Sequence, residues 1–270
     1  MYKKILAAPY VFWVICGTLI PLLAICYYGL TDRTGKFTLD NLTAIAEPVH
    51  LHALGLSLGL AILSTVICLI LSIPLALVLK GSGLGEKGFI IFIFILPMWM
   101  NFLLRTMAWQ VILEKGGIFS TALEMIGLKM PAIINTPAAI VVGMVYDFLP
   151  FMVLPIYNAL MRIDDSLIEA AQDLGAPNRI VLRKIILPLC IPGIASGITM
   201  VFVPGLTTFV ISNILGGGKI YLIGNIIEQE FTTSANWNLG SGLSLVMMLF
   251  ILVSMWILSR LDKTGEGAFL

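Results

Sequence analysis

The stretch EAAQDLGAPNRIVLRKIILP, residues 169–188, is a charged segment set between long apolar runs. Just before it, Asp164, Asp165 and Ser166 offer a helix N-cap and acidic residues at a helix start. A short helix is therefore expected over 167–174. The charged helix interrupts the apolar pattern of the chain, so we interpret the segment as its working part.

The second half of this segment contains residues that end one helix and begin another. Gly175 suits the left-handed conformation that closes a helix, and Pro177 prevents the helix from continuing. Asn178 is expected to cap a second short helix that runs to Leu187. The segment therefore predicts a helix–turn–helix.

Several of these residues resemble a known motif. The matching positions are Glu169, Ala170, Ala171, Gly175, Ile185, Leu187 and Pro188. They resemble the EAA loop in the membrane subunits of binding-protein-dependent ABC importers. The resemblance implies that 164–188 forms coupling helices in a groove of a cytoplasmic ATPase, with Glu169 making a charged contact. The alternative is an ordinary loop helix lying on the bilayer surface.

The composition indicates a polytopic membrane protein. Hydrophobic residues make up 59% of the 270 residues, charged residues 11%, and the mean hydropathy is +1.02. Soluble domains contain about a quarter charged residues, so an ordinary soluble domain is excluded. With a formal net charge of +1, the chain shows no basic patch for nucleic acid.

The apolar runs predict an all-α fold with six transmembrane helices. The expected spans are about 5–30, 54–79, 89–111, 132–161, 189–215 and 239–258. The first run is longer than a signal peptide requires, so we expect it to be retained. Together with the coupling segment, these spans form a single transmembrane permease domain, 1–270, which the resemblance assigns to the MetI-like permease fold.

The loop charges predict the orientation in the membrane. Lys and Arg are more frequent in the N-terminus, 80–88, 162–188 and the C-terminal tail than in the loops between them. By the positive-inside rule, both termini and the coupling segment face the cytoplasm.

Two charged residues, Arg105 and Asp147, fall inside predicted spans. A charge at the bilayer centre costs about 2.5–3.5 kcal/mol, so such residues normally face protein or water. For Arg105 the alternative is snorkelling toward the interface. For Asp147 it is a structural carboxylate, either hydrogen-bonded or ion-paired.

Polar and aromatic residues near these charges suggest a passage for solute. Aromatic faces and carboxylates bind organic cations by cation–π contact and charge pairing. The candidate residues for the substrate path are Asp147, Tyr146, Trp99, Asn101, Glu228 and Glu230. Asp147 is expected to offer its carboxylate to a passing cation.

Three further runs, 97–110, 136–160 and 215–231, resemble the permease subunits of spermidine/putrescine importers. The resemblance implies a polyamine importer in a bacterial inner membrane. Its partners would be a second similar permease in a heterodimer, two ATPase subunits that bind ATP and Mg²⁺, and an extracytoplasmic binding protein. Alternatives are an importer for an amino acid, thiamine or an iron chelate, or a channel or secondary transporter that works without ATP.

The sequence shows no catalytic set, cofactor motif or metal site. There is no Walker sequence, Ser/His/Asp set or redox pair, so the chain is not expected to be an enzyme. The four cysteines fall in or beside apolar spans without paired spacing. His50 and His52, expected in the first outer loop, lack a third ligand.

Overall fold

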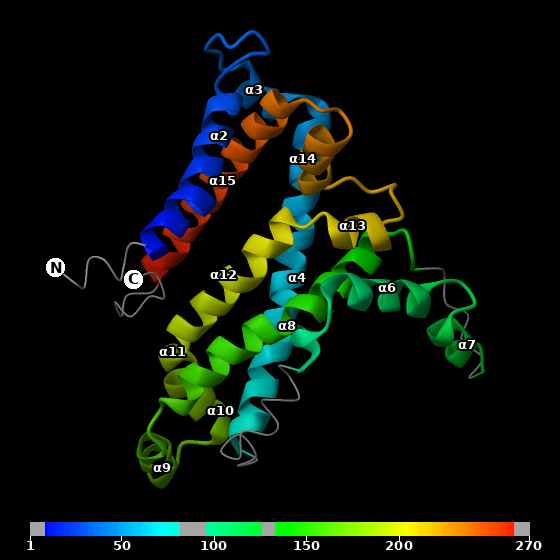
Figure 1. Cartoon of the computed structure of the whole chain (residues 1–270). Helices are drawn as coiled ribbons and strands as arrows, with labels where there is room; N and C mark the ends of the chain where they lie inside the picture. Colours follow the sequence, from blue (N-terminus) through cyan, green and yellow to red (C-terminus); the bar gives the residue numbers. More distant parts are fainter. Residues whose placement is uncertain (1–8, 82–95, 126–132, 262–270) are drawn as a thin grey trace, which may run out of the picture.

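The computed structural model describes residues 9–81, 96–125 and 133–261, and these residues are mainly helical (Figure 1). Within those ranges, the only β-type pairing is an isolated bridge between Thr31 and Phe37. The predicted all-α fold is confirmed.

Four of the described helices are long and apolar enough to cross a membrane. They occupy Pro9–Gly29, Pro48–Gly81 (α4), Pro137–Met161 (α8) and Trp237–Leu261 (α15). The first helix contains a π-helical turn, η1 (Ile15–Leu19), which is followed by α2 (Ile20–Gly29). A fifth span results if Asn178–Leu189 and α12 (Ile191–Thr207), which meet at 66°, count as one.

The third predicted span, 89–111, is described only in part. It contains η3 (Leu96–Trp99) and α6 (Phe102–Leu113), and α7 (Ile118–Met125) follows. Residues 89–95 lie outside the described ranges. The helix that is described here, α6, has 12 residues, so a full crossing in this region stays a prediction.

The connection between α2 and α4 is shorter than the sequence suggested. It contains α3 (Asp40–Thr43) and η2 (Ala44–Ala46), and α4 then begins at Pro48. Proline is well suited to the first helical position, because its missing N–H would have no partner there. His50 and His52 therefore lie on the first turns of α4, and their expected place in a loop is wrong.

The predicted fifth span, 189–215, is not one helix, because α12 ends at Thr207 and α13 (Val210–Leu215) begins three residues later. The break is stabilised by α14 (Ile223–Thr232). Asn225 Nδ2 donates a hydrogen bond to the Phe209 carbonyl at 3.1 Å. This partner lies 16 residues along the chain, so local sequence could not reveal it.

Helices α4, α8 and α12 pack together at the centre of the molecule (Figure 1). The approach of α12 to α8 is close at Gly193, where an added Cβ would lie 2.6 Å from Ala159 Cβ and from the Pro155 carbonyl oxygen. Small residues allow this contact between membrane helices. Gly193 therefore allows α12 to lie close against the helix that carries Asp147.

On one side of this centre, α2 and α15 lie side by side (Figure 1). Two asparagines take up carbonyls at the C-terminal end of α2. Asn41 Nδ2 donates to Gly29 and Thr31, and Asn238 Nδ2 donates to Tyr28 and Thr31. These bonds satisfy carbonyls that a helix end leaves without a partner.

The charged segment joins α8 to α12 at one extremity of the molecule, the lower end in Figure 1. Its elements are α9 (Asp165–Asp173), α10 (Asn178–Val181), η4 (Leu182–Ile186) and α11 (Leu187–Leu189).

Candidate functional site

Helix α9 is capped at both ends as the sequence predicts. The Asp164 side chain accepts a hydrogen bond from the Ser166 amide at 3.0 Å. At the other end, Gly175 has φ +82°. The Gly175 amide donates to Gln172 O, and the Ala176 amide donates to Ala171 O, which is the bond pattern of a Schellman motif. The cap and the glycine turn are both confirmed.

The second helix of the segment differs from the prediction at its start. Pro177 is the N-cap residue, and Asn178 lies inside the helix. The expected N-cap role of Asn178 is therefore wrong, because its side chain is engaged elsewhere. Asn178 Oδ1 accepts a hydrogen bond from Gln172 Nε2 at 3.2 Å, which links this helix to α9.

The second helix also continues beyond Leu187. It passes through the π-helical turn η4 and ends at Leu189, where it bends into α12. Pro188 has no N–H to donate back along the helix, which is consistent with the irregular hydrogen bonding before it. Ile185 and Leu187 are half-buried, and Leu187 lies beside residues of α4 and α8 at a small internal gap.

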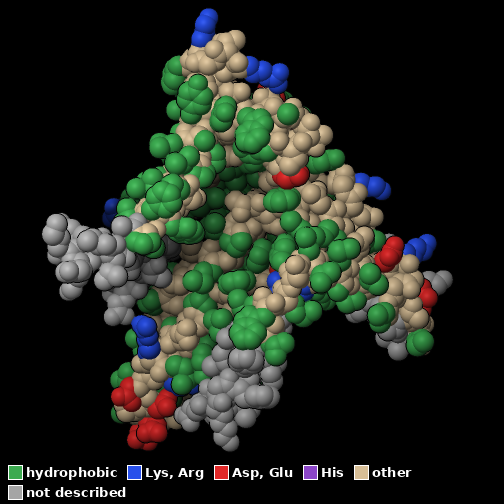
Figure 2. All heavy atoms as spheres, viewed as in Figure 1, with side chains coloured by type: hydrophobic (Ala, Val, Ile, Leu, Met, Phe, Trp, Pro, Cys, Tyr) green, Lys and Arg blue, Asp and Glu red, His purple; other side chains and the backbone are tan. Residues whose placement is uncertain are grey.

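One face of α9 is open to a partner. The helix has no buried residue, and Leu167, Glu169 and Ala170 are exposed. Leu174, which follows the helix, is 89% exposed. Leu167, Ala170 and Leu174 recur at helical spacing and form an apolar stripe beside Glu169. Figure 2 shows acidic side chains gathered at this end of the molecule. An exposed apolar stripe with acidic neighbours is suited to docking another protein.

Arg105 and Asp147 meet inside the protein. Arg105 Nε lies 2.6 Å from Asp147 Oδ1, and both residues are buried. Thr106 Oγ1 donates to Asp147 Oδ2 at 3.3 Å. The pair joins α6 to α8. Arg105 is buried against Asp147, and the ion-paired alternative for Asp147 describes its surroundings.

Three other candidates, Tyr146, Trp99 and Asn101, have different surroundings. Tyr146 packs edge-on against Trp109, with ring centroids 5.2 Å apart. Trp99 is exposed on η3. The Asn101 side chain accepts hydrogen bonds from the amides of Leu103 and Leu104, so it caps α6. Asn101 therefore has a local structural role, and its place on a substrate path stays a prediction.

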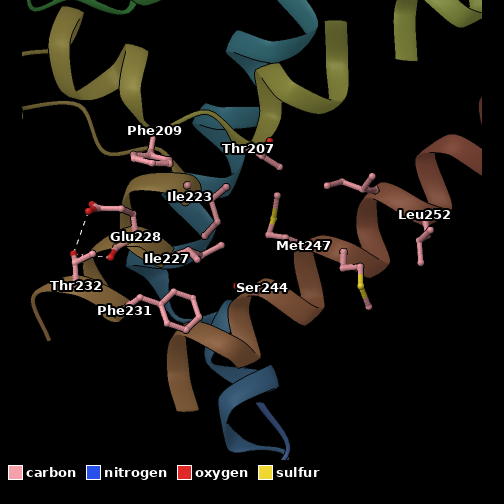
Figure 3. A pocket seen from close by; sticks show the side chains of 13 residues that line it. Thr207, Phe209, Ile223, Ile227, Glu228, Phe231, Thr232, Ser244, Met247 and Leu252 are labelled. Carbon is pink, nitrogen blue, oxygen red and sulfur yellow. Dashed lines mark hydrogen bonds between the residues drawn. The ribbon is translucent and has the colours of Figure 1, made fainter. Parts of the chain in front are cut away.

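Glu228 and Glu230 lie on α14 but line different cavities. Glu228 borders a cavity of about 530 Å³ between α12, α14 and α15 (Figure 3). Glu230 borders another, of about 860 Å³, together with His50, His52 and Lys219. Residues two apart on a helix point in different directions. Asp147 lines neither cavity, so the structure does not bring the six candidates to one place.

The cavity beside Glu228 is largely apolar and contains residues that the sequence did not single out. These are Thr207, Phe209, Phe231, Thr232, Met247 and others from α14 and α15. Thr232 Oγ1 donates to Glu228 Oε1 at 3.1 Å (Figure 3). The i, i+4 spacing of Glu228 and Thr232 on a helix is the signal that could have found this contact.

No metal centre is found in the part of the chain that the structure describes. Within it, no group of three or more His, Cys, Asp or Glu side chains could hold a metal ion.

Comparison with known proteins gives consistent matches over the chain. Residues 61–264 match the family described as "Binding-protein-dependent transport system inner membrane component". The chain is 34% identical to the spermidine/putrescine transport system permease protein PotB of Haemophilus influenzae, over 97% of this chain and 94% of that protein. It is 37% identical to PotB of Escherichia coli K12, over 83% of this chain and 84% of that protein.

The fold also matches a solved transporter structure. A chain of a bacterial ABC transporter involved in import of the acidic polysaccharide alginate aligns with a TM-score of 0.81 and 18% identity, over 98% of this chain and 95% of that one. This similarity supports the fold.

Proposed function

The chain belongs to the family of inner membrane components of binding-protein-dependent transport systems, and we propose that it is the permease subunit of an ATP-driven polyamine importer. The observation that carries this proposal is the 34% identity to a spermidine/putrescine permease over 97% of the chain. The chain is thus a transporter subunit, and ATP with Mg²⁺ is bound by its ATPase partners.

We assign the docking of an ATPase to the exposed face of α9. Glu169 supplies a charge, while Leu167, Ala170 and Leu174 supply apolar area. The two caps prevent the helix ends from fraying, so a displacement of α9 by the ATPase moves the whole helix as a rigid body. The full assembly contains two ATPases, a second similar permease and an extracytoplasmic binding protein, and both termini of this chain face the cytoplasm.

Helix α12 connects the docking face to the cavity beside Glu228. The chain runs from α10 through the 66° bend into α12, and Thr207 at the end of α12 lines that cavity. A movement imposed on the segment at Asn178 therefore reaches the cavity through the bent helix pair that ends at Thr207, before the break in which Phe209 lies.

The cavity chemistry fits a polyamine better than the surroundings of Asp147 do. A polyamine has ammonium groups separated by methylenes, so it needs spaced carboxylates and apolar or aromatic walls. Glu228 with Phe209 and Phe231 offers both kinds of contact. Asp147 is ion-paired with Arg105, so we assign the cation contact in this chain to Glu228.

Reconstituted vesicles test the proposal. The vesicles contain the complete assembly, with its binding protein, and ATP is supplied on the side where the ATPases lie. Five solutes are tested: spermidine, putrescine, an amino acid, thiamine and an iron chelate. ATP-dependent uptake of a polyamine is expected. Uptake of one of the other solutes instead would identify a different importer, and uptake that persists without ATP would favour a channel or secondary transporter.

A matched pair of variants tests the docking face. Glu169→Lys reverses the charge on α9 and is expected to reduce both ATPase recovery in a pull-down and transport. Glu114→Lys makes the same change at an exposed position after α6, and is expected to leave recovery unchanged. Equal recovery with the two variants would contradict the docking assignment.

A further inference from the structure

Lys80 lies in the last turn of α4, and its side chain is only 18% exposed. Its Nζ donates to the carbonyl oxygens of Leu160 and Ile163, each at 3.2 Å. The same atom lies 2.8 Å from Asp165 Oδ1. A lysine ammonium has three donors, so these three contacts can use all of them.

The three acceptors belong to successive parts of the chain. Leu160 is in the last turn of α8, Ile163 is in the connection, and Asp165 is the first residue of α9. Carbonyls at a helix C-terminus lack intrahelical partners and carry the negative end of the helix dipole, so a cation is favourable there. One ammonium therefore joins the end of α4, the end of α8 and the start of α9.

Helix α9 has few other attachments to the membrane helices. None of its residues is buried, and Ile168, one of its two partly buried residues, packs against the central core. Asp165 and Ile168 are three residues apart and thus lie on one side of the helix. This inner side holds α9 to the membrane domain, while Leu167, Glu169 and Ala170 are exposed.

We propose that Lys80 is a positioning residue that makes α4 move together with α9 when an ATPase displaces α9. The proposal rests on the function proposed above, because it requires an ATPase docked on α9. The three-residue connection already ties α9 to α8. Lys80 adds α4 to the same unit, so displacement of α9 reaches α4 as well as α8 and α12.

Transport measured per ATP hydrolysed tests this role in the complete reconstituted assembly. Lys80→Met keeps most of the side-chain length and removes the ammonium. It is expected to lower the ratio of solute transported to ATP hydrolysed about tenfold, which lies within the usual range of coupling between sites. Asp165→Asn removes only the exposed ion pair and is expected to lower it about threefold. Lys80→Arg retains charge and donors and is expected to restore most of the ratio.

Lys36→Met is the matched control, because Lys36 is exposed in the outer connection. It is expected to leave the ratio unchanged. If Lys80→Met leaves the ratio unchanged, or reduces it only in proportion to a loss of assembled complex, the positioning role is wrong. The same conclusion follows if Lys80→Arg behaves as Lys80→Met does.

A distance measurement separates this proposal from the identity of the solute. Spin labels at Val78 and Ser166, both exposed, report the separation of the α4 end from α9 after Cys16 and Cys26 are replaced by serine. With Lys80 present, the distance is expected to stay the same when ATP binds to the assembly. With Lys80→Met it is expected to change or broaden.

Equal distance distributions for Lys80 and Lys80→Met in both nucleotide states would overturn the proposal. This measurement needs no transported solute. Failure of the unsubstituted assembly to take up polyamines would therefore contradict the proposed substrate, and the distance measurement would still test the role of Lys80.

Discussion

The charged pair Arg105–Asp147 and the capped helix α9 place charge in opposite surroundings. Arg105 and Asp147 are buried and hold α6 to α8. In α9, Glu169 is exposed, and the helix has no buried residue. Charge in the first region is bound up in the fold, while charge in the second is available to a partner. Substitutions should therefore affect stability in the first region and coupling in the second.

The largest effect on stability is expected for Asp147→Asn. Removing one partner of a buried ion pair leaves the other charge uncompensated, which typically costs about 3–5 kcal/mol. We expect a clear fall in the melting temperature of the detergent-solubilised protein. The double variant Asp147→Asn with Arg105→Gln should recover part of the loss, since no buried charge then remains.

Glu228→Gln is the control that sharpens this prediction. Glu228 borders a cavity instead of a buried arginine, so its neutralisation is expected to reduce polyamine uptake with little change in melting. The assignment of the two carboxylates would be reversed if Asp147→Asn lost uptake with unchanged melting while Glu228→Gln lost stability.

A smaller loss of stability is expected for Gly193→Val. The substituent would meet Ala159 and the Pro155 backbone at the α8–α12 contact, and overpacking a close contact costs about 1–3 kcal/mol. Gly55→Ala on α4 is the control, because nothing lies within 4 Å of an added Cβ there. Equal melting of the two variants would show that α12 can move away from α8 at little cost.

The coupling segment was largely predictable because its contacts are local. The Asp164 cap joins residues two apart, and the turn at Gly175 depends on hydrogen bonds within six residues. The ATPase contact of Glu169 rests on the family resemblance and stays a prediction. The prediction for Asn178 failed because Pro177 takes the cap position and Gln172 engages the asparagine side chain.

The membrane region was less predictable because its polar contacts join distant residues. The sequence indicated both Arg105 and Asp147 as functional candidates. Because they lie 42 positions apart, it could not show whether they form an ion pair or line a substrate path. Lys80 was not singled out at all, since its acceptors lie 80 and 83 residues away. The break after Thr207 depends on Asn225 in another helix.

Gly175→Asp is expected to disturb coupling more than stability. The position has φ +82° and open space around an added Cβ, and aspartate tolerates this conformation better than most residues do. We expect a cost of no more than about 1 kcal/mol. The new charge lies at the C-terminus of an acidic helix, where it is unfavourable, and ATPase recovery and transport should fall.

Gly175→Asn separates charge from backbone conformation at this turn. Asparagine also tolerates positive φ and is neutral, so ATPase recovery close to that of the unsubstituted chain is expected. If both variants lose the ATPase equally, the requirement is for glycine itself, and the added charge is not the cause.

The smallest effect concerns the Asp164 cap and its dependence on pH. Hydrogen bonds from the Ser166 backbone, then its side chain, and the nearby Lys80 charge hold the pKa of this exposed carboxyl below its usual value of 3.8. A depressed folded-state pKa stabilises the helix above pH 3.8, and the contribution is lost as pH falls through the lower, folded-state pKa.

The measurement is hydrogen exchange of the Ser166 amide, corrected for its intrinsic rate. Protection of this amide should stay constant from pH 7 to 5 and be lost in the acid range. Asp164→Asn keeps a side-chain acceptor that does not titrate, so its protection should not show this acid loss. An identical acid loss in both proteins would mean that another group, and not the Asp164 carboxylate, controls the start of α9.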